Sequence, residues 1–355
     1  MKRKLATIYA VICTLLLVAG FLLVFYFAFN EGVEATVKYL IGVALGLILA
    51  PIVHELGHVC FALMAKMDYV YVKCFCFRIY LKNGKKRLGF ASPFAADETQ
   101  VLPKKGGDMK RRATLYTVGG LVYGGVFLLL ILVGAILTAA LGKPSYKLFG
   151  MLPYAAYLFL LNVLPLEYAS GKTDALVCRG IKKNYDAERC MLSVMEVQGR
   201  LFEGKTFAEI EEGYYFNLPQ LCEDEPLYAA ILDLRYRYFL EKEELEKAAD
   251  CLNRLALNEE YLPFKELEKV AAELVYMHAL NGDLESAEKN YAVCQEFLKG
   301  ESVTAKRILA TYAQACGKAE AVALLLEQAE QALAKERIAG IRKFEKILLS
   351  RINAE

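Results

Sequence analysis

Residues 51–58 read PIVHELGH and place an H-E-x-x-H pattern inside a long apolar stretch, residues 36–60. In a helix, His54 and His58 are one turn apart on the same face, so their imidazoles can reach one metal ion while Glu55 stands beside it. A catalytic zinc ion keeps three protein ligands and an open position for water, whose proton a neighbouring carboxylate can accept. The pattern predicts a zinc site with two histidine ligands and Glu55 as general base.

The apolar setting of the motif favours metal binding over chance. On a solvated helix of a soluble protein, chance would explain the pattern equally well. A charged residue at the centre of a membrane helix costs about 2.5 to 3.5 kcal/mol on insertion scales and is generally retained where it functions. The chain has three histidines, and two belong to this motif; for the third, His278, we expect a packed or surface role.

The first half of the chain is predicted to cross a membrane four times. A helix needs about 20 apolar residues to span the bilayer core, and 56% of the whole chain is hydrophobic. The first of these stretches follows a basic N-terminus and lacks a small-residue cleavage site, so it should remain as an anchor instead of being removed as a signal peptide. The predicted membrane helices are residues 7–29, 36–60, 113–141 and 148–166.

The distribution of lysine and arginine predicts the orientation. Residues 61–112 carry twelve Lys or Arg residues against four Asp or Glu residues, and residues 1–4 are basic. Both segments are therefore expected on the cytoplasmic side. Four crossings return the C-terminal half to that side, so we expect an integral protein of a bacterial plasma membrane with both termini cytoplasmic. The inner ends of the second and fourth helices then lie at the same depth.

A third metal ligand is expected at the inner end of the fourth helix, where residues 162–175 read NVLPLEYASGKTDA. Pro165 interrupts the helix, and Ser-Gly at residues 170–171 indicates a loop before a new helix begins. Two carboxylates, Glu167 and Asp174, are available there. From the residues alone either carboxylate could bind the metal, or both could be ordinary interfacial acids with water as the third ligand.

An H-E-x-x-H on a membrane helix, followed about a hundred residues later by N-x-x-P and an aspartate, resembles the site-2 protease family of intramembrane zinc metalloproteases. The resemblance covers roughly residues 36–176. It implies hydrolysis of a peptide bond in or near a membrane-spanning segment of a protein or peptide substrate. Similar bacterial members carry extra residues before the aspartate, which favours Asp174 over Glu167. The implied site comprises the Zn²⁺ ligands His54, His58 and Asp174, the general base Glu55, and the substrate-positioning residues Asn162 and Pro165.

The chain departs from the family pattern in two places. Ala175 follows the aspartate where members usually have glycine, and the third membrane helix has no asparagine where many members have one. That helix does carry glycine pairs at residues 119–120 and 124–125, which let membrane helices approach closely. The departures bear on substrate binding and leave the zinc ligands unchanged.

Three other classes of function agree less well with the sequence. A non-catalytic membrane scaffold with a structural zinc site is the main alternative, but structural zinc normally has four closed protein ligands. A transporter is disfavoured because no repeat of membrane helices is visible. The net charge of +2 provides no global basic surface, so no nucleic-acid partner is expected.

The ten cysteines are scattered along the chain and are expected to be reduced. Cys74 and Cys76 form a C-x-C pair, for which packing in a strand is favoured over metal binding.

The cytoplasmic loop between the second and third membrane helices predicts a β-hairpin at about residues 69–93. Residues 69–81 are rich in β-formers, and Asn83-Gly84 is a hairpin signal before residues 87–90. A strand edge here could hold an unwound substrate segment by strand addition. The alternative is a hairpin that rests on the membrane surface.

The fold predicted for the whole chain is mainly α: a transmembrane domain at residues 1–180 and a cytoplasmic helical repeat domain at residues 185–355. In the second domain, similar short segments recur at roughly 35 to 40 residues, close to the period of tetratricopeptide-like helix hairpins, which they resemble loosely. Stacked hairpins make a surface suited to a protein or peptide partner, although a purely stabilising tail is the alternative. The predicted helix pairs are residues 227–240 with 243–257 and residues 264–281 with 284–298.

Overall fold

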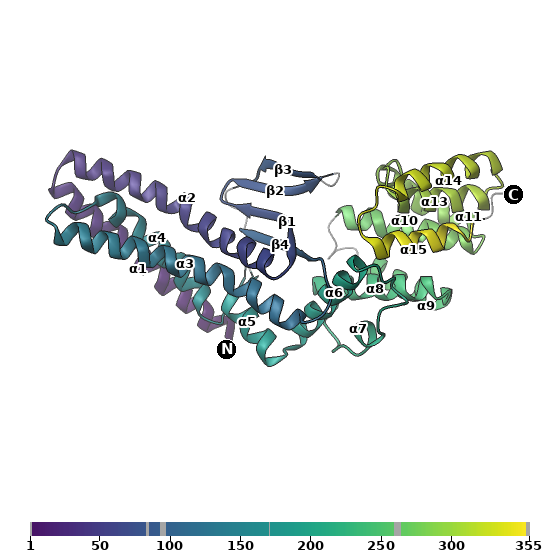
Figure 1. Ribbon diagram of the computed structural model, residues 1–355, viewed down its shortest axis with the longest axis horizontal. Helices are drawn as coiled ribbons and strands as arrows, with labels where there is room; N and C mark the ends of the chain where they lie inside the picture. Colours follow the sequence, from purple (N-terminus) through teal and green to yellow (C-terminus); the bar gives the residue numbers. More distant parts are fainter. Residues whose placement is uncertain (1, 83–84, 93–96, 170, 259–263, 353–355) are drawn as a thin grey trace. The chain divides into compact units, whose positions relative to one another are not determined.

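A computed structural model describes residues 2–82, 85–92, 97–169, 171–258 and 264–352. These residues form a mainly helical protein with a small antiparallel sheet, as predicted (Figure 1). The chain divides into two compact units. The first, here called the membrane unit, contains residues 1–102 and 108–188; the second, here called the helical unit, contains residues 103–107 and 189–355.

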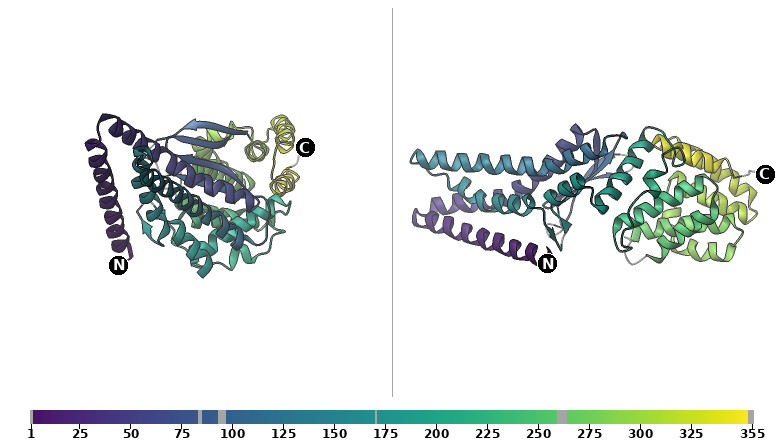
Figure 2. Two further views of the ribbon diagram at one scale, coloured as in Figure 1. Left: turned by 60° about the vertical axis from the view of Figure 1, so that its left-hand side comes forward. Right: turned by 90° about the horizontal axis from the view of Figure 1, so that it is seen from below.

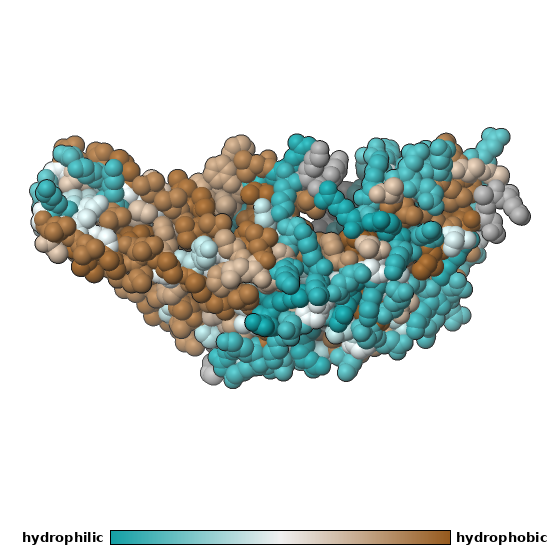
Figure 3. All heavy atoms as spheres, in the orientation of Figure 1, coloured by the Kyte–Doolittle hydropathy of each residue, from teal (hydrophilic) through white to brown (hydrophobic). Residues whose placement is uncertain are grey.

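Within the described residues of the membrane unit, three helices are long and apolar enough to cross a bilayer. They are α1 (Lys2–Asn30), α2 (Val33–Met64) and α3 (Met109–Ala140). Many of their large apolar side chains are exposed, and hydrophobic atoms cover much of the helices in the space-filling view (Figure 3). These features are compatible with the predicted membrane protein, whereas its orientation and bacterial origin stay predictions.

The fourth predicted crossing forms the shorter helix α4 (Tyr146–Val163). Its 18 residues span about 27 Å, slightly less than a bilayer core of about 30 Å, and a fourth crossing stays a prediction. The helix ends at Val163, before the predicted end at residue 166, because Pro165 disfavours the helical conformation of Leu164, whose φ is −94° and ψ 142°. Helix α4 packs against α1, α2 and α3, and these helices lie side by side in two further views (Figure 2).

Helices α2 and α3 approach very closely at the H-E-x-x-H turn. A Cβ atom added to Gly57 would lie 2.3 Å from the carbonyl oxygen of Gly119, and one added to Gly119 would lie 2.4 Å from that of Gly57. Only glycine at both positions allows this crossing. The first of the two glycine pairs noted in the sequence therefore brings the α3 backbone directly against the motif.

In the described part of the segment that follows α2, four strands form a sheet in the order β3-β2-β1-β4. Strand β1 packs against α2 and pairs antiparallel with β2, which pairs antiparallel with β3. The central position of β1 leaves β3 and β4 as the two edges. The strands are β1 (Met67–Cys74), β2 (Phe77–Lys82), β3 (Lys85–Phe90) and β4 (Glu98–Pro103).

The structure corrects the predicted strand at residues 69–81, which is two strands joined by a turn at Phe75 and Cys76. Phe75 has a φ of 51°, a left-handed conformation that a phenylalanine rarely adopts and that no glycine, proline or asparagine signals in the sequence. The hairpin signal Asn83-Gly84 lies outside the described residues. Its flanks, Lys82 and Lys85, are paired as a hairpin requires.

After α4 the chain forms a short two-stranded hairpin and a new helix. Strand β5 (Glu167–Tyr168) pairs with β6 (Gly171–Lys172), and α5 (Asp174–Lys183) follows. Ser170 of the predicted loop lies outside the described residues. The resumption of the helix near Asp174 is as the sequence indicated.

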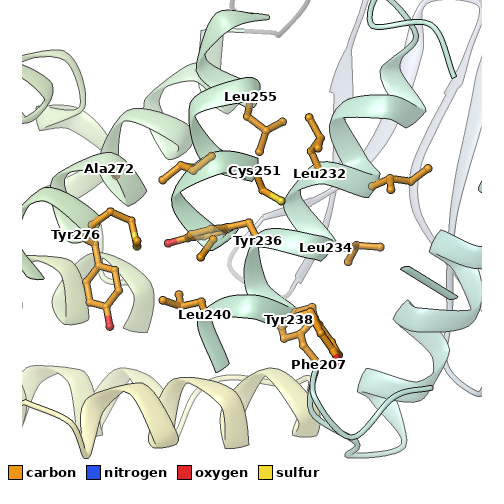
Figure 4. Close-up of a cluster of buried hydrophobic side chains, with 14 of the residues drawn as sticks. Phe207, Leu232, Leu234, Tyr236, Tyr238, Leu240, Cys251, Leu255, Ala272 and Tyr276 are labelled. Atoms are coloured by element: carbon orange, nitrogen blue, oxygen red, sulfur yellow. The ribbon is translucent and has the colours of Figure 1, made fainter. Parts of the chain in front are cut away.

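The helical unit consists of helices that pack in consecutive pairs: α8 with α9, α10 with α11 and α13 with α14. Part of its core is formed by buried side chains of α8, α9 and α10 together with Phe207, as a close-up shows (Figure 4), and further buried side chains come from α6, α11, α12, α13 and α15. The helix pairs agree with the expected hairpins, but the tetratricopeptide resemblance itself is not confirmed. The helices are α6 (Asp186–Phe202), α7 (Gly213–Phe216), α8 (Pro226–Glu241), α9 (Leu245–Leu257), α10 (Phe264–Leu280), α11 (Leu284–Val293), α12 (Gln295–Leu298), α13 (Val303–Ala315), α14 (Ala319–Leu333) and α15 (Ala339–Leu349).

Candidate metal centre

The two histidines of the motif meet an aspartate at the start of α5. Oδ2 of Asp174 lies 3.2 Å from Nε2 of His54 and 3.3 Å from Nε2 of His58. Among the residues that the structure describes, these three form a group whose ligand atoms all lie within 4.8 Å of one another and that could hold a metal ion. Their side chains are only 7 to 19% exposed, so the group is shielded from solvent.

Hydrogen bonding at His58 leaves one ring nitrogen available for a metal. Its Nδ1 lies 3.0 Å from the backbone carbonyl oxygen of Tyr116 on α3. Since a carbonyl can only accept, Nδ1 carries the proton and Nε2 of the neutral ring presents its lone pair, an arrangement typical of metal-binding histidines. Helix α3 therefore fixes the orientation of the ring.

Asp174 presents an oxygen that fits a cation. Its Oδ2 is buried and has no hydrogen-bond donor among the described residues. A carboxylate oxygen and the lone pair of a neutral imidazole nitrogen repel each other at 3.3 Å unless a cation lies between them. Two imidazole nitrogens and one carboxylate oxygen form a donor set that suits Zn²⁺.

The electrostatic environment keeps Asp174 ionised. Burial acts to raise the pKa of its carboxyl group, but His54 and His58, when their imidazoles are protonated, donate hydrogen bonds and positive charge that outweigh burial and lower the pKa to about 2. A carboxylate that binds a metal must be deprotonated. The Asp174 carboxyl group is therefore deprotonated at neutral pH, as metal binding requires.

One buried threonine places Asp174 at the start of α5. The hydroxyl of Thr173 donates a hydrogen bond to the carbonyl oxygen of Leu164 at 2.7 Å. Oγ1 of Thr173 also accepts hydrogen bonds from the backbone N–H groups of Leu166 and Leu176, both at 3.2 Å. Thr173 thus joins the end of α4 to the beginning of α5 as a helix N-cap. We did not predict this role, although a threonine just before a predicted helix start was an available signal.

Of the two carboxylates left open by the sequence, the structure brings Asp174 to the histidines and does not bring Glu167 there. Glu167 is exposed and lies in β5, opposite Lys172. Cys74 and Cys76 have free thiols, and neither belongs to the group of ligand side chains in the described part of the chain.

Glu55 is held beside the histidines by a strand that was not predicted. Glu55 is 5% exposed, and its Oε2 accepts a hydrogen bond from the hydroxyl of Thr99 on β4 at 2.5 Å. The hydroxyl of Tyr116 in turn donates to the backbone carbonyl of Thr99 at 2.5 Å. Strand β4 and helix α3 therefore fix the carboxylate. No motif around Thr99 or Tyr116 marks them in the sequence.

The two predicted substrate-positioning residues lie near the end of α4. The side-chain amide of Asn162 donates to the carbonyl oxygen of Leu158 at 3.1 Å, a contact within its own helix. Pro165 follows the last helical turn. Neither residue belongs to the group of metal ligands, and their role toward substrate stays a prediction.

Gly120 on α3 leaves the space that the two imidazoles occupy. A Cβ atom at this position would lie 2.4 Å from Nε2 of His58 and 2.8 Å from Nε2 of His54. We expect Gly120→Ala to displace both rings and to weaken zinc binding. Loss of an outer-shell partner lowers metal affinity by about 10- to 100-fold, and the effect here should be at least as large. Zinc affinity of the purified protein, measured by competition with a chelator, checks this expectation.

The control is Gly124→Ala, one helical turn further along α3. Its Cβ would lie 3.5 Å from Nδ1 of His54, an ordinary contact distance. Both substitutions improve helix propensity by the same amount, so the variants differ in their contact with the imidazoles. Equal zinc affinities for the two variants would show that the close approach of α3 does not support the site.

Comparison of the chain with protein-family models, with curated proteins and with solved structures found no match. The resemblance to site-2 proteases therefore rests on the two motifs alone.

Proposed function

We propose that the protein is an intramembrane zinc metalloendopeptidase of the site-2 protease type. The observation that supports this proposal is the convergence of Asp174, at the start of α5, with His54 and His58 on α2, a helix long enough to cross a membrane that also carries Glu55. Three ligands leave an open coordination position, which a hydrolytic zinc site needs and a structural site normally lacks. The same feature weighs against the alternative of a scaffold with structural zinc.

A zinc ion bound by these residues would polarise the scissile carbonyl group and acidify a water molecule. Glu55, adjacent to His54 in the chain, would take the proton from that water and pass it to the leaving amine. The hydrogen bond from Thr99 orients the Glu55 carboxylate and leaves its other oxygen for proton transfer. The burial of His54, Glu55 and His58 and the low exposure of Asp174 limit the access of bulk water to the reacting groups.

We further propose that an unwound substrate segment adds to strand β4. The hypothesis of strand addition to residues 69–81 needs correction, because β1 is hydrogen-bonded on both sides and has no open edge. Strand β4 is an edge, and it carries Thr99 next to Glu55. A peptide strand paired with this edge would bring its backbone carbonyl groups toward the site.

Removal of the hydroxyl of Thr99 should slow cleavage without removing the metal. A hydrogen bond to a charged group contributes about 1.5 to 3 kcal/mol, so Thr99→Val should lower kcat by roughly 10- to 100-fold. Thr99→Ser keeps the hydroxyl and should retain most activity. Zinc content and kcat of the three proteins test this role; a Thr99→Val protein with unchanged kcat would argue against it.

We also propose that the helical unit binds a cytoplasmic protein or peptide partner. A cleft on α7, α8 and α9 combines two aromatic rings with several charged side chains, and such surfaces suit peptide segments. Lys247→Glu should reduce cleavage of a full-length substrate in cells and leave cleavage of a short membrane peptide by the purified protein unchanged. The cleft is lined by Phe216, Leu232, Arg235, Phe239, Glu246, Lys247, Asp250, Cys251 and Arg254.

The proposed activity is tested on the purified full-length protein in detergent or vesicles. We expect about one zinc per chain, since the described residues supply one such ligand group. The protein should cleave a membrane-spanning peptide, lose this activity with a chelator and regain it with zinc. Protein that binds zinc but cleaves no membrane peptide would favour the scaffold alternative, and protein without zinc would remove the basis of the proposal.

A further inference from the structure

The hairpin formed by β2 and β3 has one apolar face. The register places Phe77 opposite Phe90 and Ile79 opposite Leu88, and residues directly opposite one another point to the same side of a sheet. Leu81 is two residues beyond Ile79 and shares this side. Lys86 is opposite Leu81 at the end of this side, where its ammonium group pairs with Asp68 at 2.8 Å. The five apolar residues Phe77, Ile79, Leu81, Leu88 and Phe90 are called the hairpin face below.

The hairpin face is contiguous and largely uncovered. Leu88 and Phe90 are 72% and 77% exposed, and Phe77 and Leu81 are 36% and 42% exposed. The rings of Phe77 and Phe90 lie 5.7 Å apart, so the patch continues across both strands. An exposed apolar patch of this kind usually marks a surface that contacts a partner or a membrane.

The opposite face of the same hairpin is basic. Arg78 lies opposite Gly89, and Arg87 lies opposite Tyr80, which places both arginines on the other side from the hairpin face. Both arginines are exposed. Separation of apolar and basic side chains on two faces is typical of elements that lie in the plane of a membrane interface, where cations meet anionic lipid.

The hairpin face is also close in the chain to a helix that can cross the membrane. Strand β1 begins at Met67, three residues after α2 ends at Met64, so the sheet starts within about 10 Å of the helix end. Leu63 and Met64 at that end are 52% and 68% exposed. Strand β1 packs on α2 and pairs with β2, so the sheet lies alongside the end of α2 (Figure 1).

We infer that the hairpin face is seated in the interfacial layer of an anionic lipid membrane, at the end of α2. The apolar side chains enter the boundary of the acyl chains, and Arg78 and Arg87 face the lipid phosphates and water. Strand β3 is an edge of the sheet, and its unpaired backbone groups exclude a position deep in the hydrocarbon. This membrane contact does not depend on the proposed peptidase activity.

The chain contains no tryptophan, so a single introduced tryptophan reports the depth of one position. Leu88→Trp and Phe90→Trp probe the hairpin face, and Arg87→Trp is the matched control on the opposite face of the same strand. Leu130→Trp, on the 66% exposed surface of α3, is the positive control for contact with lipid. Each full-length protein is placed in phosphatidylglycerol–phosphatidylcholine vesicles whose acyl chains are brominated near the headgroup.

We expect bromine to quench the emission of both hairpin-face probes by about twofold or more, with a blue-shifted spectrum, because an interfacial element lies about 5 to 10 Å into the headgroup and acyl boundary. Arg87→Trp should show less than half of that quenching. Vesicles of phosphatidylcholine alone should weaken the quenching at the hairpin face and leave that of Leu130→Trp unchanged.

Two results would overturn the inference. Quenching of Leu130→Trp without quenching of either hairpin-face probe would show an inserted protein whose hairpin stays off the membrane. Blue-shifted emission that is insensitive to brominated lipid but depends on protein concentration would assign the hairpin face to a second copy of the chain. Equal quenching in both lipid mixtures would exclude the selectivity for anionic lipid.

Discussion

Glu55→Gln is expected to abolish cleavage of a membrane peptide while the protein keeps its zinc. The substitution preserves the size of the side chain and its acceptor oxygen for Thr99, and it removes the carboxylate that would accept a proton. General acid–base catalysis contributes about 100- to 10,000-fold to a rate, so kcat should fall by about 100- to 10,000-fold or more. Glu55 is not among the three side chains that could hold the metal, so zinc content should not change.

Cleavage rate and zinc content are measured together on the same preparation of Glu55→Gln protein. Glu34→Gln is the control, because Glu34 is an exposed acid in the first turn of the same helix. It should match the wild type in both measurements. A Glu55→Gln protein that cleaves at the wild-type rate would exclude Glu55 as the base. A protein that loses zinc would instead place Glu55 among the determinants of metal binding.

The part of the site that depends on local periodicity could be predicted from the sequence. His54, Glu55 and His58 lie within five consecutive residues of one helix, so their common face follows from helix geometry alone. Asp174 lies more than a hundred residues later, and the residues there offered Glu167 as an equal candidate. The three-dimensional arrangement separates the two, because the Thr173 cap directs the chain so that only Asp174 meets the histidines.

The supporting residues of the site could not be predicted. Thr99 contacts Glu55 only because β4 pairs with β1, which itself packs against α2. Tyr116 contacts His58 only because Gly57 and Gly119 let two helices touch. Such contacts depend on tertiary packing, and a single sequence contains no periodic signal for them.

The boundaries of elements were predicted less well than their existence. Helix α3 begins at Met109, four residues before the predicted start at Ala113, and its first turns contain Lys110, Arg111 and Arg112. Long basic side chains can extend from a helix end toward the aqueous interface, so they do not terminate it. Apolar residues alone therefore predict a start of α3 that is four residues too late.

Asp174→Ala is expected to remove most of the bound zinc and, with it, the activity. Removal of an outer-shell partner lowers metal affinity by about 10- to 100-fold. A ligand contacts the metal directly, so the loss of zinc affinity should be larger than this. Without the carboxylate, the described site retains only two imidazole donors, fewer than the three protein ligands of a catalytic zinc site. Zinc content after dialysis and affinity by chelator competition measure this loss.

The control for Asp174→Ala is Glu167→Ala, which removes the other carboxylate considered at this end of α4. Glu167 is exposed in β5, so its variant should keep zinc and activity. Asp174→Asn adds a test that does not depend on helix propensity, because it keeps the shape of the side chain and removes its charge. If Asp174→Ala and Asp174→Asn both keep zinc while Glu167→Ala loses it, the ligand is Glu167, and the β5–β6 hairpin must rearrange when metal binds. If only the Asp174 variants lose zinc, the arrangement of His54, His58 and Asp174 is the one that holds the metal.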